Sequence, residues 1–91
     1  MILWTPLALS DLDNILNYLS EKNEDVAVHA AKLFDKAVSN IEQFPEIGIT
    51  GRKENTRELF LSQYSYVIIY RLNGNNTEIL RLLHTHQKWT T

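Results

Sequence analysis

The sequence has 91 residues, of which 44% are hydrophobic and 22% are charged, with a formal net charge of −2 and no cysteine. Such a chain predicts one globular domain over residues 1–91, and it excludes a disulfide framework, a thiolate metal site and a thiolate nucleophile. It contains neither an apolar run of about 18 residues nor a signal-peptide pattern, so we expect a cytoplasmic protein with no membrane partner.

The chain begins with a predicted strand followed by a helix. Residues 1–5 are mostly apolar and form the strand candidate. Thr5 and Pro6 are a helix-start signal, because threonine caps a helix and proline fits its first turn. Apolar residues then recur at helical spacing as far as Leu19, which predicts an amphipathic helix.

A second helix is predicted after a short polar connection. Asn23 is a good N-cap, and the apolar stripe of this helix runs from Val26 to Phe44. Pro45 ends it. Because the connection is short, the two helices should form an antiparallel hairpin.

The second half of the chain predicts strands. Residues 45–56 read as a loop and residues 57–62 as a strand. Residues 64–89 contain two β-branched and aromatic runs, and Gly74-Asn75 between them is the expected two-residue turn of a β-hairpin.

This turn fixes an expected register for the hairpin. Arg71 should pair with Glu78, which places Arg81 on the sheet face of Tyr70 and places His84 on the other face. A slip of one residue would reverse both assignments.

The predicted order is therefore β-α-α-β-β-β, an α+β fold. The antiparallel helix hairpin should pack on one face of a small, curved antiparallel sheet and leave the other face open.

Charge is distributed unevenly along the chain. Residues 1–50 carry three lysines and eight acidic residues, whereas residues 51–91 carry six basic and three acidic residues. This asymmetry suggests two faces with different partners. Alternatively, the helices carry solvated acids and the strands a few arginines.

Basic and aromatic residues gather at the end of the last predicted strand. They are Arg81, His84, His86, Lys88 and Trp89, all within nine positions. Such a cluster can hold a phosphate or a carboxylate. The alternative is that Arg81 pairs with a carboxylate of the protein and that Trp89 packs against the sheet.

No metal site or cofactor is expected. His84 and His86 have a spacing that can bind zinc, but no carboxylate or cysteine lies close to them in sequence. His29 lies in the middle of a predicted helix and is assigned no role.

Five segments resemble the RelE/ParE superfamily of toxins from type II toxin–antitoxin modules, in the family's order and spacing. They read WTPLALSDLDNILNYL, FPEIGITGR, TRELFL, YVIIYRL and EILRLLHTHQKW. The resemblance covers nearly the whole chain. It implies a small toxin with the fold described above, neutralised by an antitoxin that wraps around it.

The resemblance implies two different poisons. RelE-like members are ribosome-dependent endonucleases that cut mRNA, whereas ParE-like members inhibit DNA gyrase and are not known as hydrolases. RelE-like nucleases place an arginine just after the first tyrosine of the central strand, where this chain has Val67, and they are strongly basic. The ending from Ile79 to His84 resembles ParE-like members, so gyrase inhibition is favoured.

Cleavage of mRNA on the ribosome remains the alternative. It needs an acid, a base and cations for the phosphorane. The residues that would supply them are Arg57, Arg81, His84, His86 and Lys88.

The partner implied by the resemblance is a cognate antitoxin. An exposed edge strand and a groove beside the helix hairpin suit an antitoxin segment, and the basic second half should attract acidic residues. The residues expected to bind the target or the antitoxin are Arg52, Lys53, Arg57, Arg71, Arg81, His84, Lys88 and Trp89.

Overall fold

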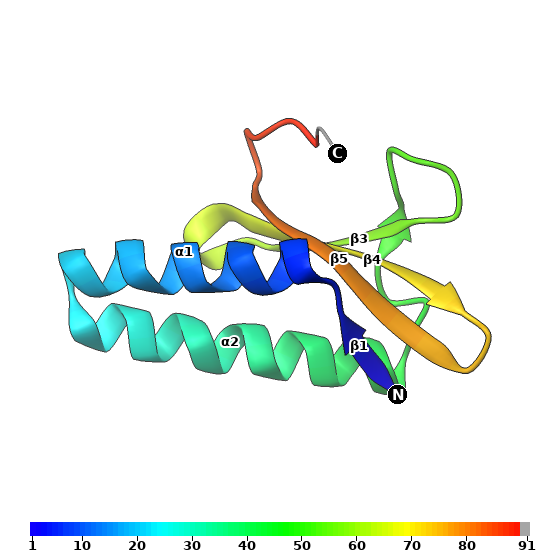
Figure 1. Ribbon diagram of the computed structural model, residues 1–91, viewed down its shortest axis with the longest axis horizontal. Coiled ribbons are helices and arrows are strands. Elements are labelled where there is room, and N and C mark those ends of the chain that lie inside the picture. Colours follow the sequence, from blue (N-terminus) through cyan, green and yellow to red (C-terminus); the bar gives the residue numbers. More distant parts are fainter. Residues whose placement is uncertain (90–91) are drawn as a thin grey trace.

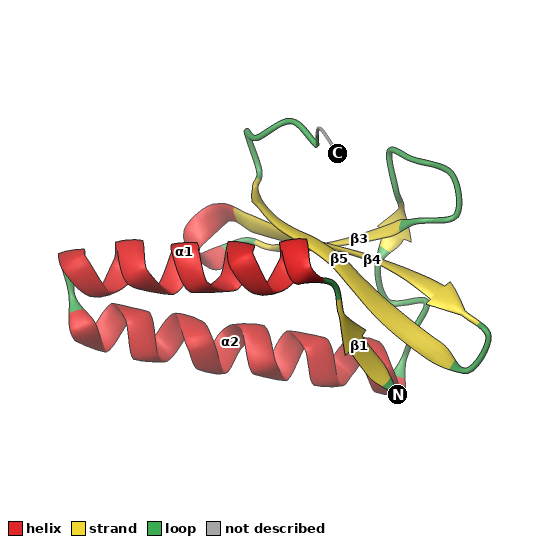
Figure 2. Cartoon of the chain, in the orientation of Figure 1, coloured by secondary structure: helices red, strands yellow, loops and turns green. Residues whose placement is uncertain are grey.

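A computed structural model describes residues 1–89 and has two layers, a helix hairpin and a sheet (Figures 1 and 2). The elements in chain order are β1 (Ile2–Trp4), α1 (Pro6–Lys22), α2 (Glu24–Gln43), β2 (Ile49–Thr50), β3 (Arg57–Leu61), a 3₁₀ turn (Gln63–Ser65), β4 (Tyr66–Asn73) and β5 (Asn76–His84). The α+β fold with an antiparallel helix hairpin on one sheet face is confirmed.

Both predicted helix caps are present. The Thr5 hydroxyl accepts a hydrogen bond from the Ala8 N–H at 3.1 Å, and the Asn23 side chain accepts from the Asp25 N–H at 2.9 Å. Each cap satisfies a backbone donor that the helix leaves unpaired. Within residues 1–89, neither helix is long and apolar enough to cross a membrane.

The core lies between the helices and one face of the sheet. Its fully buried members include Ile41 of α2 and Tyr70 of β4, which are 0% exposed. The predicted stripe of α2 is wrong at its end, because Phe44 is 62% exposed. The helix ends at Gln43, and the backbone of Phe44 (φ −130°, ψ 78°) directs the chain away from the core.

The sheet is mixed, with the strand order β1-β5-β4-β3-β2. The expected antiparallel pairing holds for four of the strands, but β1 pairs with β5 in parallel. The predicted loop at residues 45–56 contains the short strand β2, in which Ile49 pairs with Glu58 of β3.

A β-bulge at Leu80 changes the predicted register of the hairpin. Arg71 pairs with Glu78 as expected, but Arg81 pairs with Ile69 and His84 pairs with Tyr66, so Leu80 has no partner on β4. The extra residue reverses the side-chain alternation beyond it. In the register, Arg81 therefore shares the face of Ile69 and His84 the face of Tyr66, which is the opposite of the prediction for both. The side chain of Arg81 nevertheless reaches α1 at the edge of the sheet, where it meets Asp11.

Candidate functional site

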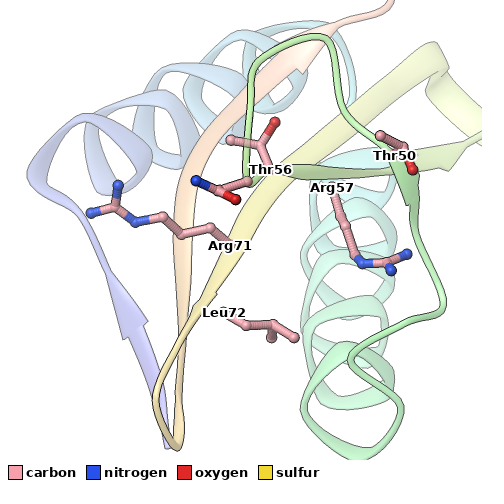
Figure 3. A pocket seen from close by; sticks show the side chains of 6 residues that line it. Thr50, Thr56, Arg57, Arg71 and Leu72 are labelled. Atoms are coloured by element: carbon pink, nitrogen blue, oxygen red, sulfur yellow. The ribbon is translucent and has the colours of Figure 1, made fainter.

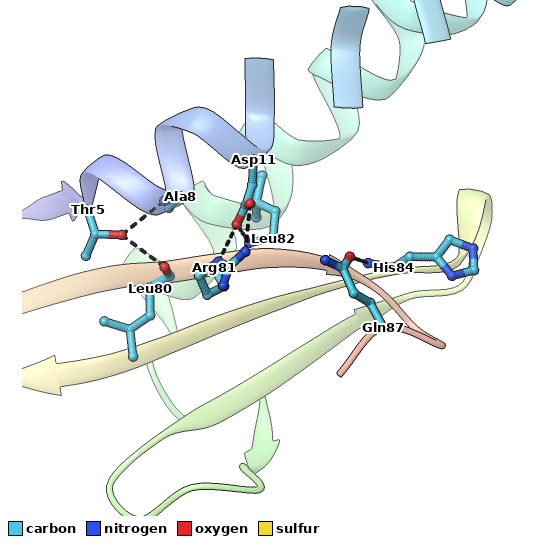
Figure 4. Close-up of polar contacts among 8 residues, drawn as sticks. All are labelled: Thr5, Ala8, Asp11, Leu80, Arg81, Leu82, His84 and Gln87. Atoms are coloured by element: carbon cyan, nitrogen blue, oxygen red, sulfur yellow. Dashed lines mark hydrogen bonds and ion pairs between the residues drawn. The ribbon is translucent and has the colours of Figure 1, made fainter. Parts of the chain in front are cut away.

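Arg81, the first residue of the predicted basic cluster, pairs with a carboxylate of a helix. Its Nε lies 2.7 Å from Asp11 Oδ2 and its Nη2 lies 3.0 Å from Oδ1, and both side chains are nearly buried (Figure 4). Asp11 also accepts a hydrogen bond from the Leu82 N–H at 3.0 Å. This pairing raises the pKa of Arg81. Arg81 thus ties α1 to β5 and presents little charge to a ligand.

The edge of β5 beyond β1 is covered by side chains from the start of α1. The Thr5 hydroxyl donates a hydrogen bond to the Leu80 carbonyl at 2.9 Å. The Asp11 carboxylate accepts a hydrogen bond from the Leu82 N–H, which lies further along the same edge of β5 (Figure 4). The bulge at Leu80 is therefore accommodated by α1 rather than by another strand.

Trp89 packs on the open face of the sheet. It lies against a buried cluster of Val67, Ile69 and Leu83. The Lys53 ammonium lies 4.0 Å from the centre of the indole ring, a cation–π contact. Among residues 1–89 the buried indole N–H has no hydrogen-bond partner. Val67 is 0% exposed, so this strand position presents no side chain to a phosphate.

Arg52 is held by Glu58 of β3. Its Nε and Nη2 each lie 2.9 Å from a carboxylate oxygen, and its backbone N–H donates to the same carboxylate at 2.8 Å. The hydrogen bond from Arg52 lowers the pKa of Glu58, which is only 5% exposed. Arg52 also lies 3.5 Å from the Gln87 carbonyl, which links this loop to the C-terminal segment.

Arg57 and Arg71 line a hollow of about 340 Å³ beside Thr50, Thr56 and Leu72. Figure 3 shows that the two guanidinium groups point in opposite directions. The Arg57 group donates to the Gly48 carbonyl at 2.7 Å. The hollow therefore does not present two converging cations.

The Arg71 guanidinium instead pairs with the carboxylate of Glu78, its cross-strand neighbour. This hydrogen bond lowers the pKa of Glu78. Three of the arginines that were predicted to bind a target or antitoxin, Arg52, Arg71 and Arg81, are thus paired with carboxylates of the protein. Lys88, also predicted, is exposed.

His84 and His86 belong to a different group from the one predicted. The His84 ring lies edge-on to Tyr66 at 5.7 Å and contacts the His86 ring at 5.3 Å, measured between ring centres. On α2, His29 Nδ1 lies 2.8 Å from the Tyr64 hydroxyl. The ring contacts thus form two groups, His29 with Tyr64 and Tyr66 with His84 and His86.

These ring contacts were only partly predictable. Sequence reasoning gave no role to His29, whose partner Tyr64 lies 35 positions further along the chain. Burial, with a smaller effect from the Tyr18 phenol, raises the pKa of Tyr66. Within residues 1–89, no three His, Asp or Glu side chains are grouped so that they could hold a metal ion.

A groove of about 280 Å³ runs between the two helices on the surface of the hairpin. Its lining residues are Leu16, Asn17, Ser20, Glu24, Ala27, Val28 and Ala31. The two helices carry most of the acidic residues of the first half of the chain. The groove thus combines apolar side chains with the carboxylate of Glu24.

Three comparisons place the chain among known proteins. A family model described as "ParE toxin of type II toxin-antitoxin system, parDE" matches residues 2–89. The Sinorhizobium fredii protein named "Putative toxin Y4kP" is 38% identical over 88 residues, which cover 97% of this chain and 91% of that protein. A solved structure titled "Chromosomal ParDE TA system from P. aeruginosa" has a similar fold, with a TM-score of 0.80 at 24% identity, covering 93% of this chain and 95% of the other.

Proposed function

Because the chain belongs to the ParE toxin family of type II toxin–antitoxin systems, we propose that it arrests growth in the cytoplasm by inhibiting DNA gyrase. On this proposal it acts by binding rather than by hydrolysis. A cognate antitoxin neutralises it.

The separation of the residues that a ribonuclease would need supports gyrase over mRNA. Arg57 pairs with Tyr70 and His84 with Tyr66, four positions apart on β4, which is about 13 Å along a strand. Arg81 is neutralised by Asp11. A phosphorane needs an acid, a base and cations around one point, and these residues do not surround one.

A DNA-cleavage assay tests this proposal. Purified chain incubated with gyrase and supercoiled plasmid should accumulate cleaved complexes, and equimolar antitoxin should abolish them. The competing function predicts cuts at codon positions in a translation extract, mapped by primer extension and lost in H84A and R81A variants. Such cuts without cleaved gyrase complexes would overturn the proposal.

We further propose that the antitoxin lies in the groove between the two helices. Apolar side chains line this groove, and Val28 is 48% exposed there. The carboxylate of Glu24 in the lining favours an antitoxin segment with a basic residue beside its apolar anchors. This differs from the acidic segment expected from the sequence, because Arg52, Arg71 and Arg81 already have carboxylate partners.

Two variants with the same change in net charge test the location. Val28→Glu places a carboxylate in the groove and should weaken antitoxin binding at least about tenfold, while growth arrest remains. Lys36→Gln alters α2 outside the groove and should leave the affinity unchanged. Equal affinities for both variants in a titration would exclude the groove.

A further inference from the structure

The open face of the sheet carries a small apolar cluster that is separate from the main core. Its members are Val67 and Ile69 of β4 and Leu83 of β5, and all three are 0% exposed. The helices pack on the other face of the sheet, so they do not bury this cluster. Among the described hydrophobic side chains, Leu80 and Trp89 pack against it, and Trp89 belongs to the segment that follows the last strand. The C-terminal segment therefore helps to cover the open face.

This segment has few bonds to the body of the protein. The Thr85 N–H donates to the Ser65 carbonyl at 2.8 Å, which anchors the start of the segment to the turn before β4. The next backbone bond, from the Gln87 N–H to the His84 carbonyl, lies at the end of β5 itself and makes no link to another element. Residues 86–88 are exposed. They therefore bridge the anchor at Thr85 and the terminal indole while burying little surface of their own.

The loop between β2 and β3 contacts the far end of the segment. The Lys53 ammonium lies 4.0 Å from the centre of the Trp89 ring. Arg52 Nη1 lies 3.5 Å from the Gln87 carbonyl, which is long for a hydrogen bond. Figure 1 shows this loop and the C-terminal segment on the same side of the sheet, away from α2. Because Lys53 is exposed, its cation–π contact contributes only modestly, so these two contacts hold the segment in place weakly.

The Trp89 indole is not enclosed on all sides. It borders a hollow of about 330 Å³ that is also lined by Leu80 and by Leu7 at the start of α1. Its buried N–H has no hydrogen-bond partner among residues 1–89. Lifting the ring would expose apolar surface, but it would also return this N–H to water and rehydrate the Lys53 ammonium. Because these effects oppose each other, lifting the segment should cost less free energy than unfolding the domain.

We infer that residues 85–89 form a strap that lifts about Thr85 while the rest of the domain stays folded, and that the contact between Lys53 and Trp89 holds it closed. The closed strap covers the apolar cluster on the open face of the sheet. When the strap lifts, Val67, Ile69 and Leu83 become accessible, so the protein presents this apolar surface only in the lifted state. The strap is independent of the proposed function, because it depends only on contacts within the chain.

Native-state hydrogen exchange of the indole N–H groups tests whether the strap lifts by itself. The chain has two tryptophans, so ¹⁵N-tryptophan labelling of the wild type gives two indole signals, which the W4F variant assigns. The Trp89 indole should be protected at least about a hundredfold less than the backbone N–H of Ile68 in the central strand β4. Its exchange rate should also stay constant in low concentrations of urea. An indole with the protection and the urea dependence of Ile68 would lift only on global unfolding, which would overturn the inference.

Variants of Lys53 test what holds the strap closed. K53Q removes the cation and should raise the exchange rate of the Trp89 indole about two- to fivefold, whereas K53R keeps a cation beside the ring and should retain the wild-type rate. K36Q is the matched control, because it makes the same change in charge at an exposed position of α2, and it should leave the rate unchanged. A wild-type rate in K53Q, or an equal acceleration in K36Q, would overturn the role of the Lys53–indole contact.

Discussion

β5 carries two arginine–carboxylate pairs, one on each side of the bulge at Leu80, and the two pairs differ in what they join. Near the turn, Glu78 pairs with Arg71 across two adjacent strands, and the arginine is half exposed. Beyond the bulge, Arg81 pairs with Asp11 of α1, and both side chains are at most 14% exposed. The first pair lies within a β-hairpin whose register is already set by its turn, whereas the second connects the helix layer to the sheet.

This difference leads to a general expectation for the molecule. Contacts within the sheet should contribute little individually, because water solvates their partners when they are broken. Contacts that tie the sheet to helices and loops should contribute more, because their loss leaves polar groups buried and unpaired.

The largest effect is expected for Asp11→Ala. It leaves the nearly buried Arg81 guanidinium and the Leu82 N–H without partners, so the free energy of unfolding should fall by about 3 kcal/mol. Urea denaturation measures this loss. Asp13→Ala, on an exposed position of the same helix, is the control and should change stability little. If both variants lose the same free energy of unfolding, the Arg81–Asp11 pair does not stabilise the fold in the way expected here.

A smaller loss is expected for Tyr70→Phe. The fully buried Tyr70 hydroxyl accepts from the Gly48 N–H at 2.9 Å and donates to the Pro45 carbonyl at 2.7 Å, which ties β4 to the loop after α2. Removing it should cost about 1–2 kcal/mol in thermal or urea unfolding. Tyr18→Phe removes an exposed hydroxyl and should be neutral; a neutral Tyr70→Phe would mean that water replaces both bonds.

The Arg52–Glu58 ion pair should make the stability of the fold depend on pH. Arg52 lowers the pKa of Glu58 in the folded protein below its usual value of 4.5, so the folded state favours the ionised carboxylate. The resulting stabilisation is present above pH 4.5 and is lost as the pH falls through the lowered folded pKa. Glu58→Gln should therefore be less stable than wild type at neutral pH, with a difference that shrinks on acidification. If the difference in stability between wild type and Glu58→Gln is constant with pH, the contribution of the Arg52–Glu58 pair is not electrostatic.

The smallest effect is expected for Arg71→Ala. Its partner Glu78 lies on the adjacent strand near the turn, and the turn holds the register without this pair. The unfolding midpoint should stay within experimental error of the wild type. A loss of stability as large as that of Asp11→Ala would remove the distinction between the two ion pairs of β5.

The elements that follow local rules were predictable from sequence. Thr5 and Asn23 cap their helices through side chains that bond to neighbours two or three residues away, so the signal lies in a few adjacent letters. The turn at Gly74, which has a φ of 62°, likewise fixes the pairing of Arg71 with Glu78. Local chemistry determines these features, and local patterns reveal them.

The bulge and the site were not predictable in the same way. Leu80 is an ordinary apolar residue in an apolar run, and what accommodates its bulge is Thr5 and Asp11 from the start of the chain. Similarly, neither Tyr64 nor Ser65 is a residue type that signals a left-handed backbone, so nothing in the sequence placed Tyr64 against His29. Both features depend on contacts between distant segments, which residue patterns do not encode.

The parallel pairing of β1 with β5 has a consequence for how the toxin is made. Among the strands that the structure describes, β1 pairs with β5 alone, and β5 follows the other four in the chain. Until β5 has been synthesised, Ile2 and Trp4 lack the part of the core that β5 supplies, and Asp11 lacks its partner Arg81. The sheet therefore cannot be completed until β5 has been synthesised, so this fold forms late in translation.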